Sequence, residues 1–151
     1  MFRFEKSNIV EVHAEVLVNT VNIYGVMGKG IALEFKKAFP ENYQLYREAC
    51  NNRQIDIGKI FVAATGRELP KYIINFPTKM NWRNPSKYEY IEKGLISLVS
   101  WLKENKVKSI AIPPLGCGNG KLDWSKVKPM VINSLKSFEN NLEIIIVEPA
   151  V

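Results

Sequence analysis

The chain has 151 residues with 21 Lys or Arg and 15 Asp or Glu, which gives a formal net charge of +6 and a sequence pI near 9.3. This length suits one domain, which we expect to span residues 1–151, and the basic charge favours a polyanionic partner such as nucleic acid or a phosphorylated ligand. Two cysteines and one histidine exclude a disulfide framework and ordinary Cys/His metal spacing, so we expect no metal and no cofactor. With no apolar run of membrane-span length and no signal-peptide core, we expect a cytoplasmic, monomeric protein without membrane contact.

Short apolar runs alternate with helical patterns along the chain. In chain order they predict strands over residues 2–5, 9–12 and 16–21, helices over 30–39 and 43–51, strands over 60–64 and 72–76, a helix over 86–104, a strand over 109–112, a helix over 125–138 and a strand over 142–147. Pro40 ends the first helix, and Ser86 with Glu89 reads as a capping box for the third. The last strand, LEIIIV, is nearly all apolar, as in a strand covered on both faces. This order predicts an α/β/α sandwich around a largely parallel sheet.

The stretch LVNTVNIYGVMGKGIALEF, residues 17–35, joins a buried strand to a helix through a glycine-rich loop. Its three glycines are Gly25, Gly28 and Gly30. Glycine lets the main chain approach an anion, and the following helix N-terminus adds partial positive charge. Asn19 and Asn22 can bond a ligand hydroxyl or carbonyl without bringing charge. The known phosphate motifs do not fit, because GxxxxGK[ST] is absent and Leu33 replaces the third glycine of the dinucleotide fingerprint. A nucleotide or sugar-phosphate site is predicted, with a simple turn as the alternative.

Two further polar loops follow buried strands: NFPTKMNWRNPS after Ile74 and PPLGCGNGKLDW after Ile112. Ligands of open α/β sheets bind beyond the carboxyl ends of the strands, so the three loops should line one cleft. The third loop has three glycines at alternate positions, namely Gly116, Gly118 and Gly120. This spacing can turn successive N–H groups inward, which favours diphosphate binding over a flexible turn. Asp123 is expected to cap the next helix rather than to act as a catalyst.

The second loop carries Lys79, Trp82 and Arg83. Desolvation and like charge at an electropositive rim would lower the pKa of Lys79 and free its amine to attack an aldehydic carbon. A solvated surface lysine is the alternative. Trp82 beside Arg83 is suited to stack on a base and contact a phosphate, and core packing is the competing role for the tryptophan.

The set VNTVN…GVMGKGIALEFKKAFP, NFPTK…W and PPLGCGNGKLDW resembles the macro domain, the ADP-ribose-binding family, over nearly all 151 residues. The GVMGKGIALEFK and FPTK strings resemble the branch with the DNA ADP-ribosyl glycohydrolase antitoxins of bacterial toxin–antitoxin pairs and the human terminal ADP-ribose glycohydrolase. The resemblance implies a three-layer α/β/α sandwich with a six-stranded mixed, largely parallel sheet. Two positions depart from the pattern: Gly120 stands where the human relative has an aspartate, and Asn81 where similar antitoxins carry histidine.

The resemblance also implies residue roles. Asn8 and Ile9 would contact the adenine, Asn22 would hold the distal ribose, and residues 115–120 would bind the diphosphate. Lys79 matches the catalytic lysine that ends the FPTK strand, and Asn22 would lie beside it in the catalytic pair. The full set of implied ADP-ribose contacts is Asn8, Ile9, Asn22, Met27, Gly28, Lys29, Gly30, Thr78, Leu115, Gly116, Cys117, Gly118, Asn119 and Gly120.

The implied activity is removal of ADP-ribose from a modified base, thymine above all, in single-stranded DNA. Lys79 would attack C1″ after ring opening, giving a transient imine, or act electrostatically on the sugar. Trp82 and Arg83 would guide the DNA. The implied partners are ADP-ribose, ADP-ribosylated single-stranded DNA and a cognate ADP-ribosyltransferase toxin. Two other functions stay open: an ADP-ribose reader without turnover, and an esterase on ADP-ribosyl carboxylates or O-acetyl-ADP-ribose that uses only a positioned water.

Overall fold

A computed structural model describes residues 1–149, so the last two residues of the predicted 1–151 domain lie outside the described part. The strands are β1 (Phe2–Glu5), β2 (Val16–Asn22), β3 (Phe61–Ala64), β4 (Tyr72–Lys79), β5 (Ser109–Ile112) and β6 (Glu143–Val147). The helices are α1 (Gly30–Ala38), α2 (Pro40–Asn51), α3 (Tyr88–Glu104) and α4 (Trp124–Leu135), and short 3-10 turns occupy Ile9–Glu11, Gly118–Gly120 and Lys136–Phe138.

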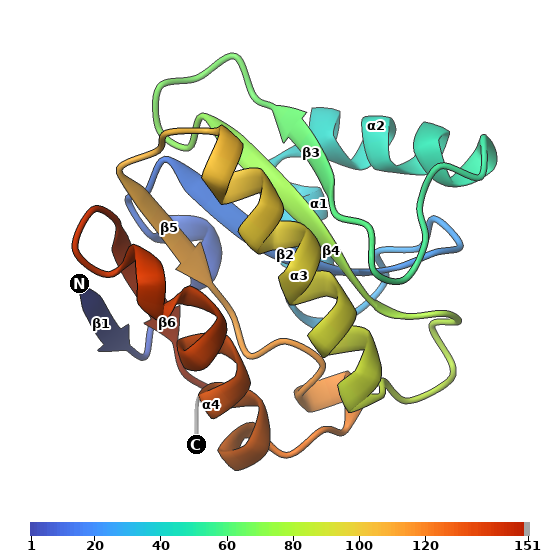
Figure 1. Cartoon of the computed structure of the whole chain (residues 1–151). Coiled ribbons are helices and arrows are strands. Elements are labelled where there is room, and N and C mark those ends of the chain that lie inside the picture. The colour runs from blue at the N-terminus through green and yellow to red at the C-terminus, as the bar shows by residue number, and fades with distance from the viewer. Residues whose placement is uncertain (150–151) are drawn as a thin grey trace.

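The strands form one six-stranded sheet in the order β1-β6-β5-β2-β4-β3. Neighbouring strands run parallel except β3 and β4, which are antiparallel. Helices α3 and α4 cover one face of the sheet, and α1 and α2 lie behind the other (Figure 1). The predicted three-layer α/β/α sandwich with a six-stranded mixed, largely parallel sheet is confirmed.

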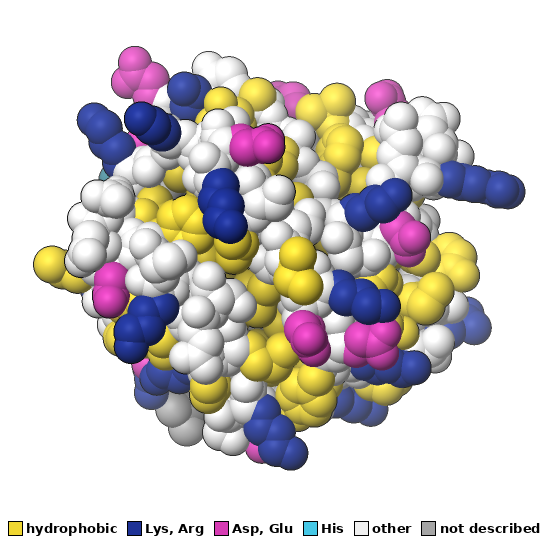
Figure 2. All heavy atoms as spheres, in the orientation of Figure 1, with side chains coloured by type: hydrophobic (Ala, Val, Ile, Leu, Met, Phe, Trp, Pro, Cys, Tyr) yellow, Lys and Arg dark blue, Asp and Glu magenta, His cyan; other side chains and the backbone are white. Residues whose placement is uncertain are grey.

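Both faces of the sheet carry apolar side chains, which is why the central strands read as nearly continuous apolar runs. On β6, Ile144 belongs to the core under α3 and α4, and Ile145 belongs to the core on the opposite face, under α1. On β2, Val18 and Leu17 divide between the faces in the same way. Outside these layers, basic, acidic and apolar side chains are scattered over the face shown in Figure 2.

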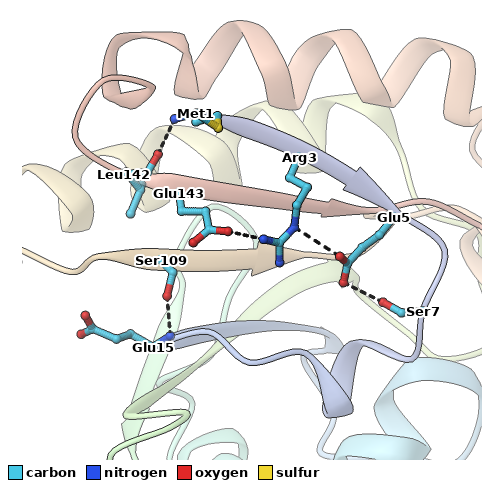
Figure 3. Close-up of polar contacts among 8 residues, drawn as sticks. All are labelled: Met1, Arg3, Glu5, Ser7, Glu15, Ser109, Leu142 and Glu143. Carbon is cyan, nitrogen blue, oxygen red and sulfur yellow. Dashed lines mark hydrogen bonds and ion pairs between the residues drawn. The ribbon is translucent and has the colours of Figure 1, made fainter.

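The N-terminal strand β1 forms the sheet edge beside β6 (Figure 3). The N-terminal ammonium donates to the Leu142 carbonyl oxygen at 2.7 Å, and Arg3 pairs with Glu143 on β6 and, through Nε at 3.3 Å, with Glu5. Exposed ion pairs like these contribute about 0–1 kcal/mol each. Because β1 runs parallel to β6, the turn Ile9–Glu11 that follows lies at the same rim as the loops after β2 and β5.

Two sequence predictions in the first third of the chain need correction. The predicted strand over residues 9–12 is absent, and Ile9–Glu11 form a 3-10 turn, because the Asn8 side chain accepts a hydrogen bond from the Val10 backbone N–H at 3.3 Å and caps the turn. Helix α2 begins at Pro40 rather than at residue 43, since proline needs no N–H partner in the first helical turn.

The predicted capping box before α3 is also wrong. The N-cap is Lys87, and it makes no side-chain cap bond. Glu89 instead forms an ion pair with Lys93 one turn further on, at 2.8 Å. Ser86 is buried, and its backbone N–H donates to the Gly120 carbonyl oxygen at 2.9 Å. This bond ties the start of α3 to the third glycine loop.

Candidate functional site

A cavity of about 420 Å³ opens at the carboxyl ends of β2, β4 and β5. The loops after these three strands and the first turn of α1 form its walls. The lining residues are Thr20, Val21, Asn22, Val26, Gly28, Lys29, Gly30, Ile31, Ala32, Thr78, Lys79, Trp82, Pro114, Gly116, Cys117, Gly118, Asn119 and Gly120. A volume of this size is typical of ligand pockets. The prediction that the three loops line one cleft is confirmed.

A second cavity of about 380 Å³ adjoins the first. The two share Gly30, Ile31 and Pro114 in their walls, so they form one elongated groove along the rim. Asn8 and Ile9, the two residues predicted to contact adenine, line the second cavity. The groove therefore suits a long ligand rather than a compact one.

Two predicted site residues, Met27 and Leu115, have buried side chains that line neither cavity. Met27 is 1% exposed in the core between β2 and α2, and Leu115 is 0% exposed in the core under α3 and α4. These exposed fractions are of the whole residue, so neither residue offers surface to a ligand in this structure.

The backbone shapes the third loop. Gly116, Gly118 and Lys121 have φ angles of 73°, 63° and 65°, in the left-handed region. Backbone bonds close the loop, including Lys121 N–H to the Gly118 carbonyl oxygen at 3.0 Å. A Cβ on Gly116 would lie 2.7 Å from the Leu122 Cδ1, whereas a Cβ on Gly118 would meet nothing within 4 Å. Gly116 therefore permits packing, and Gly118 exposes backbone to the open cavity.

The first and third loops touch across the groove. Gly30 has a φ of 58°, and a Cβ there would lie 2.9 Å from Nδ2 of Asn119. The angle favours glycine at the start of α1, whereas the end of the Asn119 side chain could shift to relieve the contact. The α1 N-terminus, a favourable position for an anion, thereby lies against the third loop.

Asn22 holds the first loop through its side chain. Its Oδ1 accepts hydrogen bonds from the backbone N–H groups of Tyr24 at 2.9 Å and Val26 at 3.4 Å, and its Nδ2 donates to the Val26 carbonyl oxygen at 2.8 Å. The buried Tyr46 hydroxyl of α2 lies 2.7 Å from the Asn22 carbonyl oxygen and 3.0 Å from Oδ1. Burial raises the pKa of Tyr46, so its hydroxyl stays a donor. An amide nitrogen carries two hydrogens, so one donor of Asn22 remains beyond the bond to Val26.

Asn19 does not share this position. It is fully buried, and its Nδ2 donates to Oδ1 of Asn75 at 3.2 Å. Asn75 in turn exchanges hydrogen bonds with Asn42 of α2 at 2.8 and 3.1 Å. The expectation that Asn19 contacts a ligand is wrong, because its amide ties β2 to β4 beneath the groove.

Strand β4 continues to Lys79, three residues beyond its predicted end at residue 76. Val21 pairs with Pro77 and Asn22 pairs with Lys79, so Thr78 is the extra residue of a β-bulge. This bulge brings Lys79 opposite Asn22 at the end of the paired strands. Bulges re-aim side chains, and they are common beside active sites.

The Lys79 ammonium lies in a desolvated, electropositive position. Its Nζ is 3.5 Å from the Trp82 carbonyl oxygen. Partial burial, followed by the charges of Lys29 and Lys121, lowers the pKa of Lys79. The predicted direction of the shift and its two causes are confirmed. A larger share of neutral amine is available than on an ordinary surface lysine.

Two side chains near Lys79 were assigned competing roles from the sequence. Trp82 lines the larger cavity and is 44% exposed, so the core-packing alternative is wrong. Arg83 lies over the Trp82 ring, with Cζ 4.7 Å from the ring centre, and lines neither cavity. Asp123 caps α4 as predicted, by accepting from the Ser125 backbone N–H at 2.9 Å.

Cys117 also lines the larger cavity. Burial raises the pKa of its thiol to about 11, so it is protonated near neutral pH and unsuited to act as a nucleophile. Across residues 1–149 there is no cluster of three or more His, Cys, Asp or Glu side chains that could hold a metal ion. Within the same residues, no helix is long and apolar enough to cross a membrane.

Sequence reasoning missed Tyr46, Val26 and Pro114. Val26 and Pro114 line the groove, and Tyr46 holds Asn22 from behind. Val26 and Pro114 lie in loops that the sequence already assigned to the cleft, so their position in its wall could have been predicted from the sequence. Tyr46 sits in an ordinary helical pattern 24 residues from Asn22, and nothing local marks that contact.

A three-layer α/β/α domain with two glycine loops over a groove at its carboxyl rim is typical of proteins that bind nucleotides or sugar phosphates. A model of the Macro domain family matches residues 18–131. The chain belongs to the macro domain family.

One curated relative and two solved structures are similar to nearly the whole chain. The chain is 52% identical to the DNA ADP-ribosyl glycohydrolase of Thermus aquaticus over 150 residues, which cover 99% of this chain and 41% of that protein. The solved macrodomain of Mycobacterium tuberculosis DarG matches with a TM-score of 0.96 and 44% identity over 99% of both chains. Thermosipho africanus DarTG, solved in complex with ADP-ribose, matches with a TM-score of 0.89 and 31% identity over 98% of this chain and 41% of that one. The chain thus spans about two fifths of the curated Thermus relative.

Proposed function

We propose that this chain is a DNA ADP-ribosyl glycohydrolase domain that removes ADP-ribose from a modified base, most specifically thymine, in single-stranded DNA. The observation that carries the proposal is the position of Lys79. It lies opposite Asn22 in the register of β2 and β4, at the mouth of the groove, where its pKa is lowered. Relatives from Thermus aquaticus and Mycobacterium tuberculosis, at 52% and 47% identity, are named DNA ADP-ribosyl glycohydrolases, which supports the same activity.

ADP-ribose would lie along the groove in one direction. The adenine would lie by Asn8 and Ile9 in the smaller cavity, and the diphosphate would lie on the backbone of residues 115–120. The distal ribose then reaches Asn22, whose remaining amide hydrogen is available to a sugar hydroxyl. Gly28, Lys29 and Gly30 would lie around this ribose, and the α1 N-terminus would add favourable charge for the diphosphate.

The reaction breaks the bond between C1″ of the ribose and the base. A water oxygen bonds to C1″, and its proton goes to the base nitrogen as the base leaves. Lys79 contributes in one of two ways. Its neutral amine attacks C1″ of the ring-opened sugar and forms an imine that water then hydrolyses, or its ammonium stabilises charge on the reacting sugar.

The domain would work as an antitoxin enzyme beside a cognate ADP-ribosyltransferase toxin, as a monomer in the cytoplasm, and without a cofactor. Its partners would be ADP-ribose and ADP-ribosylated single-stranded DNA. Trp82 and Arg83 at the groove mouth would receive the DNA, because an exposed indole and a guanidinium suit a base and a phosphate.

A reader that binds ADP-ribose without turnover is the second candidate. One observation favours it: the residues that line the larger cavity, all within the described chain, include no Asp or Glu to activate a water. An esterase on O-acetyl-ADP-ribose would also use this cavity and would not need Lys79.

The test is incubation of the protein with single-stranded DNA ADP-ribosylated on thymine, with the products resolved by gel and mass spectrometry. Release of unmodified DNA and free ADP-ribose supports the glycohydrolase. Tight ADP-ribose binding without release supports the reader. Hydrolysis of O-acetyl-ADP-ribose with intact ADP-ribosyl DNA supports the esterase.

A further inference from the structure

A continuous surface runs away from Lys79 along the loop after β4 and the start of α3. The Ser86 backbone N–H donates to the Gly120 carbonyl oxygen at 2.9 Å, and the Asp123 backbone N–H donates to the Tyr88 hydroxyl at 3.1 Å. These two bonds join the segment to the third glycine loop. In Figure 1 this surface lies at the lower end of α3, where the orange loop leads into α4.

Three cations each lie over an aromatic ring around the start of α3 and the loops beside it. The charged group of Arg83 lies 4.7 Å from the Trp82 ring centre, that of Lys87 lies 5.7 Å from Tyr90, and that of Lys126 lies 5.8 Å from Tyr88. Trp82 is 44% exposed, and the two tyrosines are partly exposed. We refer to these six residues as the basic-aromatic strip.

The charge of the strip region is positive. Residues 79–90 and 114–126 contain five basic side chains and two acidic ones, a balance of 5 − 2 = +3. The basic side chains are Lys79, Arg83, Lys87, Lys121 and Lys126. Both carboxylates have partners: Glu89 pairs with Lys93 at 2.8 Å, and Asp123 accepts from Ser125 Oγ at 2.7 Å. Glu89 and Asp123 also attract Lys87 and Lys126, and the region still keeps a net positive charge that attracts an anion.

We infer that the basic-aromatic strip binds the DNA strand that flanks the modified nucleotide, with its rings against bases and its cations against phosphates. This inference rests on the proposed function, because that function brings a single strand to Lys79. A single strand offers one phosphate and one accessible π-face per nucleotide, which suits a surface where each cation lies beside a ring. Duplex DNA offers the phosphates but keeps its bases stacked, so the rings favour a single strand.

The first experiment measures binding of an unmodified ten-residue oligothymidylate with a fluorescent end label, by anisotropy over a range of salt concentrations. The strip variant is Lys87→Gln with Lys126→Gln. The matched control is Lys103→Gln with Lys106→Gln, which removes the same charge at the other end of α3, about 25 Å away at 1.5 Å per residue. Loss of two phosphate contacts should reduce the slope of log K against log salt by about 1.4 in the strip variant. The control should keep the slope.

The rings are tested separately with Tyr90→Leu, which keeps an apolar side chain but removes the π-face. Affinity for oligothymidylate should fall about fivefold or more. Affinity for polyphosphate, which has charge but no bases, should not change. An equal loss for both polyanions would mean that the rings do not contact bases and would overturn their part of the inference.

An unchanged salt slope in the strip variant, or an equal change in the control, would overturn the inference. ADP-ribose affinity, measured alongside, should be the same in all variants because none lies in the groove. Failure of the proposed function looks different: no variant and no wild-type protein would release ADP-ribose from DNA, whatever happens to oligothymidylate binding.

Discussion

The two glycine loops over the groove are held in different ways. Asn22 and Tyr46 hold the first loop by side-chain hydrogen bonds of 2.7 to 3.4 Å. The third loop is held by left-handed backbone at Gly116, Gly118 and Lys121 and by its own backbone bonds. The side-chain hydrogen bonds in the first loop fix the direction of the Asn22 amide donor, and selection of a sugar hydroxyl requires such a fixed donor. A backbone nest binds an anion without side-chain chemistry, as a diphosphate requires. Lys79 lies between the two loops and is the group suited to react.

The largest expected effect comes from filling the third loop. Gly118→Val should weaken ADP-ribose binding more than about a hundredfold, because the new side chain would project into the cavity and the valine would resist a φ of 63°. Binding is measured by calorimetry. In a melting experiment at a hundredfold excess over Kd, ADP-ribose should stabilise the wild type by about 2.7 kcal/mol and leave this variant unshifted.

Gly66→Val is the matched control for Gly118→Val. Gly66 has a φ of 77° with nothing within 4 Å of its Cβ position, and it lines neither cavity. Both variants carry the same backbone strain, on the order of 1–2 kcal/mol. Normal ADP-ribose binding by Gly118→Val, or equal loss in both variants, would show that the diphosphate does not lie on this loop.

A smaller effect is expected when the first loop loses its support. Tyr46→Phe removes the hydroxyl hydrogen bond to the Asn22 carbonyl oxygen, while Oδ1 keeps its bonds from Tyr24 and Val26, and the lost buried bond should cost about 1–3 kcal/mol. Hydrogen exchange should speed up at the amides of Tyr24 and Val26, which donate to Asn22, and stay the same at Lys121 in the third loop. Tyr43→Phe, on the same helix, is the control. Equal loosening of both loops would contradict the separation drawn between them.

The smallest effect concerns the pH dependence of the reaction. Because burial, Lys29 and Lys121 lower the pKa of Lys79, one limb of the kcat/KM profile should lie below the ordinary lysine value of 10.5. An imine route needs the neutral amine, so its rate rises with pH through this limb. An electrostatic role needs the ammonium, so its rate falls there.

Lys121→Gln should move that limb to higher pH, because it removes one of the two like charges. Lys106→Gln, at the far end of α3, should leave the limb in place. If the limb stays at the same pH in both variants, it reports the titration of a group other than Lys79.

The fold and the rim were predictable because their signals are local. The alternation of apolar runs and helical patterns gave the layers, and parallel strands put three loops on one rim. The 3-10 turn at Ile9 was missed because a capping Asn8 outweighs an apolar run too short to decide between strand and turn. The capping box at Ser86 failed because that residue packs against Gly120, a contact 34 residues away in sequence.

The site was predictable in its glycines and in Lys79, since residue type and position carry that information. The contacts that position these residues were not predictable. The bulge at Thr78 that brings Lys79 opposite Asn22 depends on pairing between distant strands, and the hydroxyl of Tyr46 reaches Asn22 only after α2 has packed on the sheet. Asn19 looked equivalent to Asn22, and only the folded structure shows that Asn22 lines the cavity while Asn19 bonds Asn75 beneath it.

The most direct test of the central claim, that the loops bind ADP-ribose while Lys79 acts on the sugar, is a single-turnover measurement with ADP-ribosylated single-stranded DNA on Lys79→Ala. We expect Lys79→Ala to lose nearly all release of ADP-ribose and to keep ADP-ribose affinity within severalfold of the wild type. The reason is that the lysine contributes to the reacting state rather than to ground-state binding. On the imine route, borohydride also traps an ADP-ribosyl adduct on the wild type and none on the variant. Full activity of Lys79→Ala would contradict a role for Lys79 in the reaction and make a water-based, esterase-like reaction the better explanation.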